Sequence, residues 1–166
     1  MALHRSTVEQ WYERYVVPDQ APARDKPNNV FQRTFEDSRY PQHEVQPQFS
    51  PDGRWLAYCS DESGSGERQI YVRPFPNVDS GGSWQISTGE GNSPRWSPDG
   101  KKLYYLIGAN IAEAVMAVDV ETEPTFSHGK PKVILRGRYL GSLPNNGIPF
   151  DVHPDGQRFL MIKQGR

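Results

Sequence analysis

Three short runs of the chain are apolar at successive positions rather than at alternating ones. They span Trp55 to Cys59, Leu103 to Ile107 and Phe159 to Ile162. A strand of this composition is covered on both faces, so the runs predict sheets that are packed between neighbouring sheets. Third strands are expected at Gln69 to Phe75 and around Ala114 to Val120, and fourth strands at Trp84 to Thr88 and Lys132 to Leu135. The pattern predicts an all-β fold.

A Pro-Asp-Gly triplet precedes each apolar run. The triplets begin at Pro51, Pro98 and Pro154, which gives spacings of 47 and 56 residues. Proline suits the first central position of a type I turn, aspartate suits the second, and glycine adopts the left-handed conformation that follows. The residue before each triplet can bond backbone amides of the turn through its side chain; these residues are Ser50, Ser97 and His153. Repeats of this length with four strands each are typical of β-propeller blades.

The repeat also resembles a known family. The segment from Val30 through Lys163 resembles the TolB-type, WD-like propeller blades, and it is most similar to the terminal blades of propellers fused to bacterial serine/threonine kinases. The motifs that carry the resemblance are Phe49-Ser50-Pro51-Asp52-Gly53, Tyr71-Val72-Arg73-Pro74-Phe75-Pro76 and Trp96-Ser97-Pro98-Asp99-Gly100. The resemblance implies a propeller fold, but it implies little about chemistry because propellers host many unrelated functions.

The chain contains fewer blades than a closed propeller needs. Residues 29–166 hold about two and a half blades: whole blades at about 46–88 and 92–136, a terminal hairpin at 148–163, and an outer strand at 29–34. A closed propeller has about four to eight blades, so incomplete sheets would expose their edges. We expect homo-oligomerisation to complete about six blades, in a two-fold dimer first and a trimer second, with strand 29–34 of one protomer completing the hairpin of the next. The alternative is a fragment of a larger propeller.

The first 28 residues depart from the repeat. Ser6 to Glu9 form a capping box, and apolar residues then recur at helical spacing until Pro18. These residues are Val8, Trp11, Tyr12, Tyr15 and Val16. The pattern predicts a short amphipathic helix over residues 7–17, followed by a Pro-rich linker over residues 19–28.

Composition and charge limit which partners and which cellular compartment are expected. The net charge of −1 and the pI of about 6.4 give no broad attraction to nucleic acid or to an anionic membrane. No apolar run reaches the length of a membrane span and no signal peptide is recognised, so a cytoplasmic location is expected, although related propellers are often periplasmic. The single cysteine, Cys59, is expected to be buried in the core.

No motif of a known catalytic type is present, and the sequence assigns no catalytic residue. Residues 63–66 lack the Gly-x-Ser-x-Gly spacing of a nucleophile elbow, and the chain has no phosphate-binding loop, Cys-x-x-Cys pair or His-Glu-x-x-His motif. The remaining candidate is the central channel of a propeller, whose mouth would be ringed by loops at 42–46, 89–93 and 144–147. The candidate ligand-binding residues are Gln46, Gln48, Asn92, Arg95, Asn146 and Asp151.

Two function classes remain open. The first is a binding or interaction module that holds a peptide, protein or small ligand at the channel mouth and at the loops 61–68 and 108–110. The second is a metal-dependent hydrolase of phosphotriesters, esters or lactones, with Zn²⁺ or Ca²⁺ held by His43, Glu44 and Glu90. The alternative is that these polar loops are solvated and hold no metal.

Overall fold

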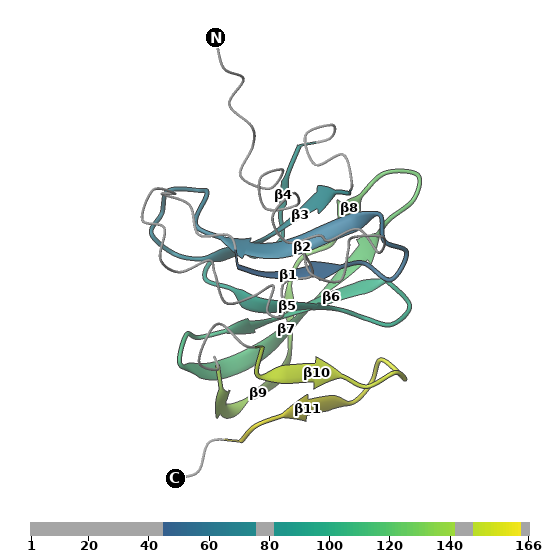
Figure 1. Ribbon diagram of the computed structural model, residues 1–166. Coiled ribbons are helices and arrows are strands. Elements are labelled where there is room, and N and C mark those ends of the chain that lie inside the picture. The colour runs from purple at the N-terminus through teal and green to yellow at the C-terminus, as the bar shows by residue number, and fades with distance from the viewer. Residues whose placement is uncertain (1–44, 76–81, 142–147, 164–166) are drawn as a thin grey trace, which may run out of the picture.

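The computed structural model (Figure 1) describes residues 45–75, 82–141 and 148–163, and every regular element in these ranges is a β-strand. The all-β prediction is therefore confirmed. The predicted helix over residues 7–17, the Pro-rich linker and the predicted strand at 29–34 lie outside the described residues. In the described ranges, no helix has the length and apolar character needed to cross a membrane.

The described strands form three antiparallel layers. The first sheet contains, in chain order, β1 (Val45–Phe49), β2 (Trp55–Ser60), β3 (Gln69–Pro74) and β4 (Trp84–Gln85). The middle sheet contains β5 (Asn92–Trp96), β6 (Lys102–Ile107), β7 (Ile111–Glu121) and β9 (Lys132–Leu140), and the short β8 (Ser127–His128) pairs with the end of β7. The third layer is the hairpin of β10 (Phe150–Val152) and β11 (Phe159–Met161).

The strands predicted within the described ranges are found in the predicted order, but β7 and β9 are longer than expected and β4 ends at Gln85 instead of Thr88. Strand β9 continues to Leu140, whereas the sequence pattern predicts its end near Leu135. Its last residues have partners on two sides, because Leu140 lies opposite Ile111 of β7 and donates its backbone N–H to Ile162 O at 2.8 Å. The hairpin thereby extends β9 through a contact between residues far apart in the chain, which a local sequence pattern does not predict.

The three Pro-Asp-Gly turns have the predicted geometry. Gly53, Gly100 and Gly156 have φ values of 71°, 70° and 69°, in the left-handed region that glycine adopts without strain. The N–H of each glycine donates to the carbonyl oxygen three residues earlier, at 2.8, 2.9 and 2.8 Å. The triplets therefore close three equivalent hairpins.

The sheets are stacked on one another (Figure 1). Two clusters of buried apolar side chains between them form the core. Alternate residues of β6 point to opposite sides: Leu103 and Tyr105 pack against the first sheet, and Tyr104 and Leu106 pack against the hairpin. Cys59 is buried as predicted, and burial raises the pKa of its thiol to about 12. Strands β2 and β6 are thus covered on both faces.

The same prediction is wrong for the third apolar run. In the hairpin, Phe159 and Met161 face the middle sheet, whereas Leu160 and Ile162 are exposed. The reason is that the described chain supplies no layer beyond the hairpin. A strand with the sequence pattern of an interior layer therefore lies at one end of the stack.

Candidate functional site

The first strands of the three layers, β1, β5 and β10, lie next to one another. The indole N–H of Trp96 on β5 donates to Gln48 O on β1 at 3.1 Å, and Arg95 Nε of β5 lies 3.4 Å from Phe150 O on β10. Polar side chains of these strands therefore meet across layers. Three of them, Gln48, Arg95 and Asp151, form what we call the inner-strand row; each lies three residues before the proline of its own turn.

Arg95 is the centre of the inner-strand row. Its Nη1 group donates a hydrogen bond of 2.6 Å to Gln48 Oε1, and its Nε lies 3.8 Å from Asp151 Oδ1. Burial lowers the pKa of the Arg95 guanidinium, and the negative charge of Asp151 opposes this shift. Arginine nevertheless remains charged at neutral pH, because its ordinary pKa is so high.

The charge on Arg95 is only partly compensated. Its side chain is 24% exposed, whereas the Asp151 side chain is 70% exposed and therefore well hydrated. A carboxylate in that setting, 3.8 Å away, interacts weakly with its partner. Within the described residues, Arg95 Nη2 makes no hydrogen bond, so the guanidinium retains donors for a further acceptor.

The starts of β1 and β5 each carry a bulge. Gln46 and Ser93 lie 47 residues apart and have φ values of 57° and 55°, although neither is glycine. The pairing register shifts at both places, as expected for β-bulges. Gln46 Oε1 accepts the backbone N–H of Ser93 at 2.8 Å, so this predicted ligand-binding residue links the first strands of two layers.

Two polar atoms beside these bulges are buried without a partner. Asn92 donates through Nδ2 to Gly108 O at 2.8 Å, but its Oδ1 has no hydrogen-bond partner among the described residues. Ser93 Oγ is in the same situation. Unsatisfied buried polar atoms are rare in folded proteins and are commonly paired with ordered water or with a ligand.

The predicted metal ligands are described only in part. His43 and Glu44, like the predicted ligand-binding residue Asn146, lie outside the described residues. Glu90 lies between β4 and β5 and is partly buried. Among the described residues, no three His, Cys, Asp or Glu side chains gather in a way that could hold a metal ion.

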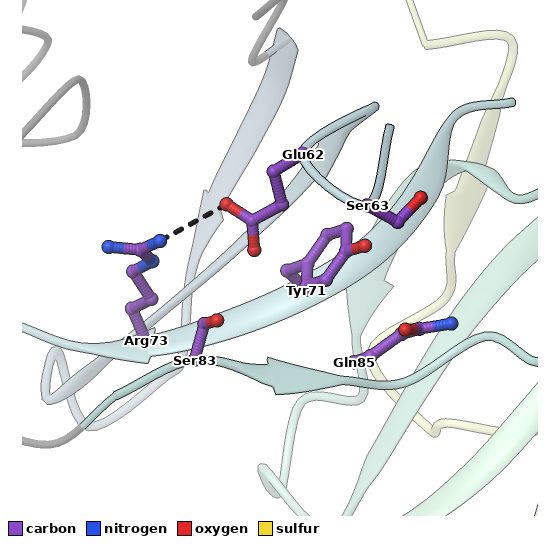
Figure 2. A pocket seen from close by; sticks show the side chains of 6 residues that line it. All are labelled: Glu62, Ser63, Tyr71, Arg73, Ser83 and Gln85. Carbon is purple, nitrogen blue, oxygen red and sulfur yellow. Dashed lines mark hydrogen bonds and ion pairs between the residues drawn. The ribbon is translucent and has the colours of Figure 1, made fainter. Parts of the chain in front are cut away.

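An open pocket of about 530 Å³ lies on the outer face of the first sheet (Figure 2). Its lining residues are Glu62, Ser63, Tyr71, Arg73, Ser83 and Gln85. The sequence indicates the loop 61–68 as a candidate ligand loop, and this loop contributes Glu62 and Ser63. The residues from β3 and β4 were not predicted. Their only sequence signal is a charged residue, Arg73, that directly follows the apolar run from Ile70 to Val72.

The charged groups of the pocket compensate each other. Arg73 Nη2 lies 3.1 Å from Glu62 Oε2, and Arg73 Nε donates to the Tyr58 hydroxyl at 2.6 Å. Burial lowers the pKa of Arg73, but Tyr58 and Glu62 outweigh this effect, so its pKa lies above the ordinary value. Arg73 and Glu62 form part of the pocket wall. Because their charges are paired, the pocket offers a ligand less uncompensated charge than the inner-strand row does.

No family model matches the chain, and no curated protein sequence matches it.

Proposed function

We propose that this chain is part of a β-propeller of the TolB-like type that acts as a non-catalytic binding module. In this proposal, the inner-strand row faces the central channel and binds a ligand with a carboxylate group. The fold part of the proposal is supported by three stacked layers that have equivalent turns and adjacent first strands. In a propeller, the innermost strands of successive blades line the channel.

One observation carries the choice of ligand. The half-buried Arg95 is held by Gln48 in a fixed position, and its charge is incompletely neutralised by the exposed Asp151. A guanidinium with free donors binds carboxylates through parallel hydrogen bonds, and this pairing is strong when it is shielded from water. Asp151 lies beside it as an acceptor for an N–H group of the ligand. A carboxylate next to an N–H donor is the arrangement at the C-terminus of a peptide.

The proposal is tested with peptides that differ only in their terminal group. A pool of N-acetylated tripeptides with free carboxylates is added to the labelled protein, and the backbone amide signals of residues 95 and 151 are followed by NMR. The same pool with amidated C-termini is the comparison. We expect the free acids to shift these signals and the amides to leave them unchanged.

The variant Arg95→Gln should weaken binding of the free acids by about tenfold or more, because a charge-assisted hydrogen bond is lost. The matched control is Arg54→Gln, since Arg54 is exposed on the first turn and already pairs with Asp52 at 2.9 Å. Equal binding of acids and amides, or equal binding by the Arg95 variant and the parent chain, would contradict the proposal.

The proposal also includes assembly into a ring of about six blades, as a dimer first and a trimer second. The alternative function, a metal-dependent hydrolase, stays a prediction from the sequence. No observation on the described residues favours it, because only Glu90 of its three predicted ligands is described.

A further inference from the structure

Strand β9 is an outermost strand of the middle sheet, and one of its edges is open. It pairs with β7 on one side. On the other side, the described residues give it strand contacts only from its last two residues, Tyr139 and Leu140, to the chain beyond β11. From Lys132 to Arg138, that edge carries backbone N–H and C=O groups that no described strand pairs.

The length of this edge distinguishes β9 from its counterpart in the first sheet. Strand β4 lies at the corresponding place, on the side of the first sheet away from β1, but it has only two residues, whereas β9 has nine. Short edge strands are one way in which proteins avoid pairing with other chains. A nine-residue edge is long enough for an extended peptide to add to the sheet as a further strand.

The charges along β9 all have the same sign. Residues 129–140 contain four basic residues and no acidic one, although the whole chain has a net charge of −1. The four are Lys130, Lys132, Arg136 and Arg138. Lys132 lies 3.4 Å from Asp119 Oδ2, but the other three side chains make no hydrogen bond or ion pair among the described residues. The edge therefore carries positive charge that the described chain does not compensate.

Exposed apolar side chains lie beside these charges. Val133 and Ile134 are 40% and 44% exposed. Leu135 and Tyr139 instead pack against the cluster between the middle sheet and the hairpin, and the two exposed arginines alternate with them along the strand. A strand added at this edge would therefore meet apolar side chains at one end and positive charges at the other.

We infer that the open edge of β9 binds an extended acidic segment of a partner protein, which adds to the middle sheet as a further strand. Backbone hydrogen bonds hold the segment, because an open edge is matched by another backbone with N–H and C=O groups. Its acidic side chains pair with Arg136 and Arg138, and its apolar side chains cover Val133 and Ile134. The register of the β7–β9 pairing shifts twice, so backbone pairing is interrupted and the charges contribute to the affinity.

The same charges exclude a second copy of β9 as the occupant. Two β9 strands that paired with each other would bring like charges together, which destabilises a sheet. The site is also separate from the inner-strand row, because β6 and β7 lie between β9 and β5. The inference therefore goes beyond the proposed function and does not rest on it.

The test uses peptides that differ only in charge, added to the labelled full chain while NMR follows the backbone amide signals of residues 132–138. The probe repeats Glu-Val four times and is acetylated and amidated, so it has no terminal carboxylate. It should shift the signals of β9 and leave that of residue 95 unchanged. The same peptide with Gln in place of Glu should bind about tenfold more weakly, and one with Lys should not bind.

N-methylated probes test whether the backbone of the peptide pairs with β9. Successive backbone N–H groups of a strand point to opposite edges, so methylation of all the Glu nitrogens blocks one edge and methylation of all the Val nitrogens blocks the other. A peptide that adds as a strand should lose binding in one of these two forms and keep it in the other.

The protein variant is the double replacement Arg136→Gln with Arg138→Gln, which should weaken binding of the Glu-Val probe by about tenfold. The matched control is Arg54→Gln with Lys101→Gln, which removes the same charge from two exposed turn positions outside β9 and should leave binding unchanged. All four side chains are exposed, and circular dichroism verifies that both variants are folded.

Several results would overturn the inference. The first is the absence of any shift on β9 at probe concentrations up to about 1 mM. Others are equal binding of the Glu and Gln peptides, equal binding by the Arg136/Arg138 variant and the parent chain, and full binding of both methylated forms. Equal shifts with an oligothymidylate of the same charge would show attraction to any anion. Shifts at residue 95 alone would assign the peptide to the inner-strand row, so the two proposals fail separately.

Discussion

Equivalent residues in the repeat make equivalent contacts, and the side chains of the turns show this at the smallest scale. Ser97 Oγ donates to Asp99 Oδ1 at 2.6 Å and accepts the backbone N–H of Lys102 at 2.8 Å. Ser50 makes the same two contacts one repeat earlier, with Asp52 and Trp55, at 2.5 and 3.0 Å. The predicted bond from these hydroxyls to the backbone is therefore confirmed, and one serine and one aspartate fix each of these two turns. In the third turn, His153 Nδ1 accepts the backbone N–H of Asp155 at 3.2 Å.

Replacement of Ser97 by alanine tests this arrangement, because the serine influences the pKa of Asp99. The hydrogen bond from Ser97 is the main cause that lowers the pKa of Asp99, and the N–H of Lys101 adds to it. Because this pKa is lower in the folded than in the unfolded chain, the stabilisation is complete above the ordinary value of 3.8 and is lost as pH falls through the folded value.

In Ser97→Ala, the pKa of Asp99 should rise toward 3.8, and the free energy of unfolding at pH 7 should fall by about 1 kcal/mol. NMR titration of the carboxyl carbon and urea unfolding measure the two quantities. Ser127→Ala, at an exposed position, is the control and should change neither. An unchanged Asp99 titration in Ser97→Ala would show that the serine does not hold the carboxylate.

At the scale of elements, the order of the strands is set by local turns, whereas the length of a strand depends on the strands that pair with it. The Pro-Asp-Gly hairpins bring β1 to β2, β5 to β6 and β10 to β11 without help from distant residues. Consecutive turns also lie close together: a Cβ atom at Gly100 would lie 3.6 Å from Pro51 Cδ, and one at Gly156 would lie 3.8 Å from Pro98 Cδ. The turns therefore align along one side of the stack.

A Gly53→Ala variant should destabilise the protein by about 1 kcal/mol, because alanine is strained in the left-handed conformation at φ 71°. No atom lies within 4 Å of the added methyl group, so the cost comes from the backbone alone. The control is Gly89→Ala, which also has open space but no positive φ, and which should change stability by less than about 0.5 kcal/mol. Urea denaturation measures both, and equal midpoints for the two variants would contradict the argument.

At the scale of the whole molecule, the middle sheet couples the other two layers. Its strand β6 contributes alternate residues to both hydrophobic clusters, so the first sheet and the hairpin share a support. Three tryptophans, Trp55, Trp84 and Trp96, belong to the cluster between the first and middle sheets. In a Trp11→Phe background, in which these three tryptophans remain, fluorescence therefore reports on one interface, while circular dichroism reports on all strands.

A Leu106→Ala variant should destabilise the described fold by about 2–5 kcal/mol, since it leaves a cavity between the middle sheet and the hairpin. Because the layers share β6, fluorescence and circular dichroism should still report one coincident urea transition. Ile134→Ala, at an exposed position of the same sheet, should cost much less. A fluorescence transition that stays at the parent midpoint while the circular dichroism transition shifts would show that the hairpin unfolds separately.

The sequence by itself determined the strands, their order and the geometry of the turns. These features depend on residues that are neighbours in the chain, such as Pro98-Asp99-Gly100 and the apolar run that follows, and local backbone preferences act at that range. It also indicated Gln48, Arg95 and Asp151 as candidate binding residues, but not that Arg95 contacts both of the others.

Only the tertiary structure decided which polar groups meet and which apolar faces stay open. Gln48 and Arg95 are 47 residues apart, and Glu62 pairs with an arginine inside a strand, so both contacts depend on how layers and loops pack. The run from Phe159 to Ile162 has the same apolar pattern as the covered strands, yet Leu160 is exposed. A sequence pattern indicates that the face of a strand can be buried, but the face is buried only where a neighbouring layer covers it.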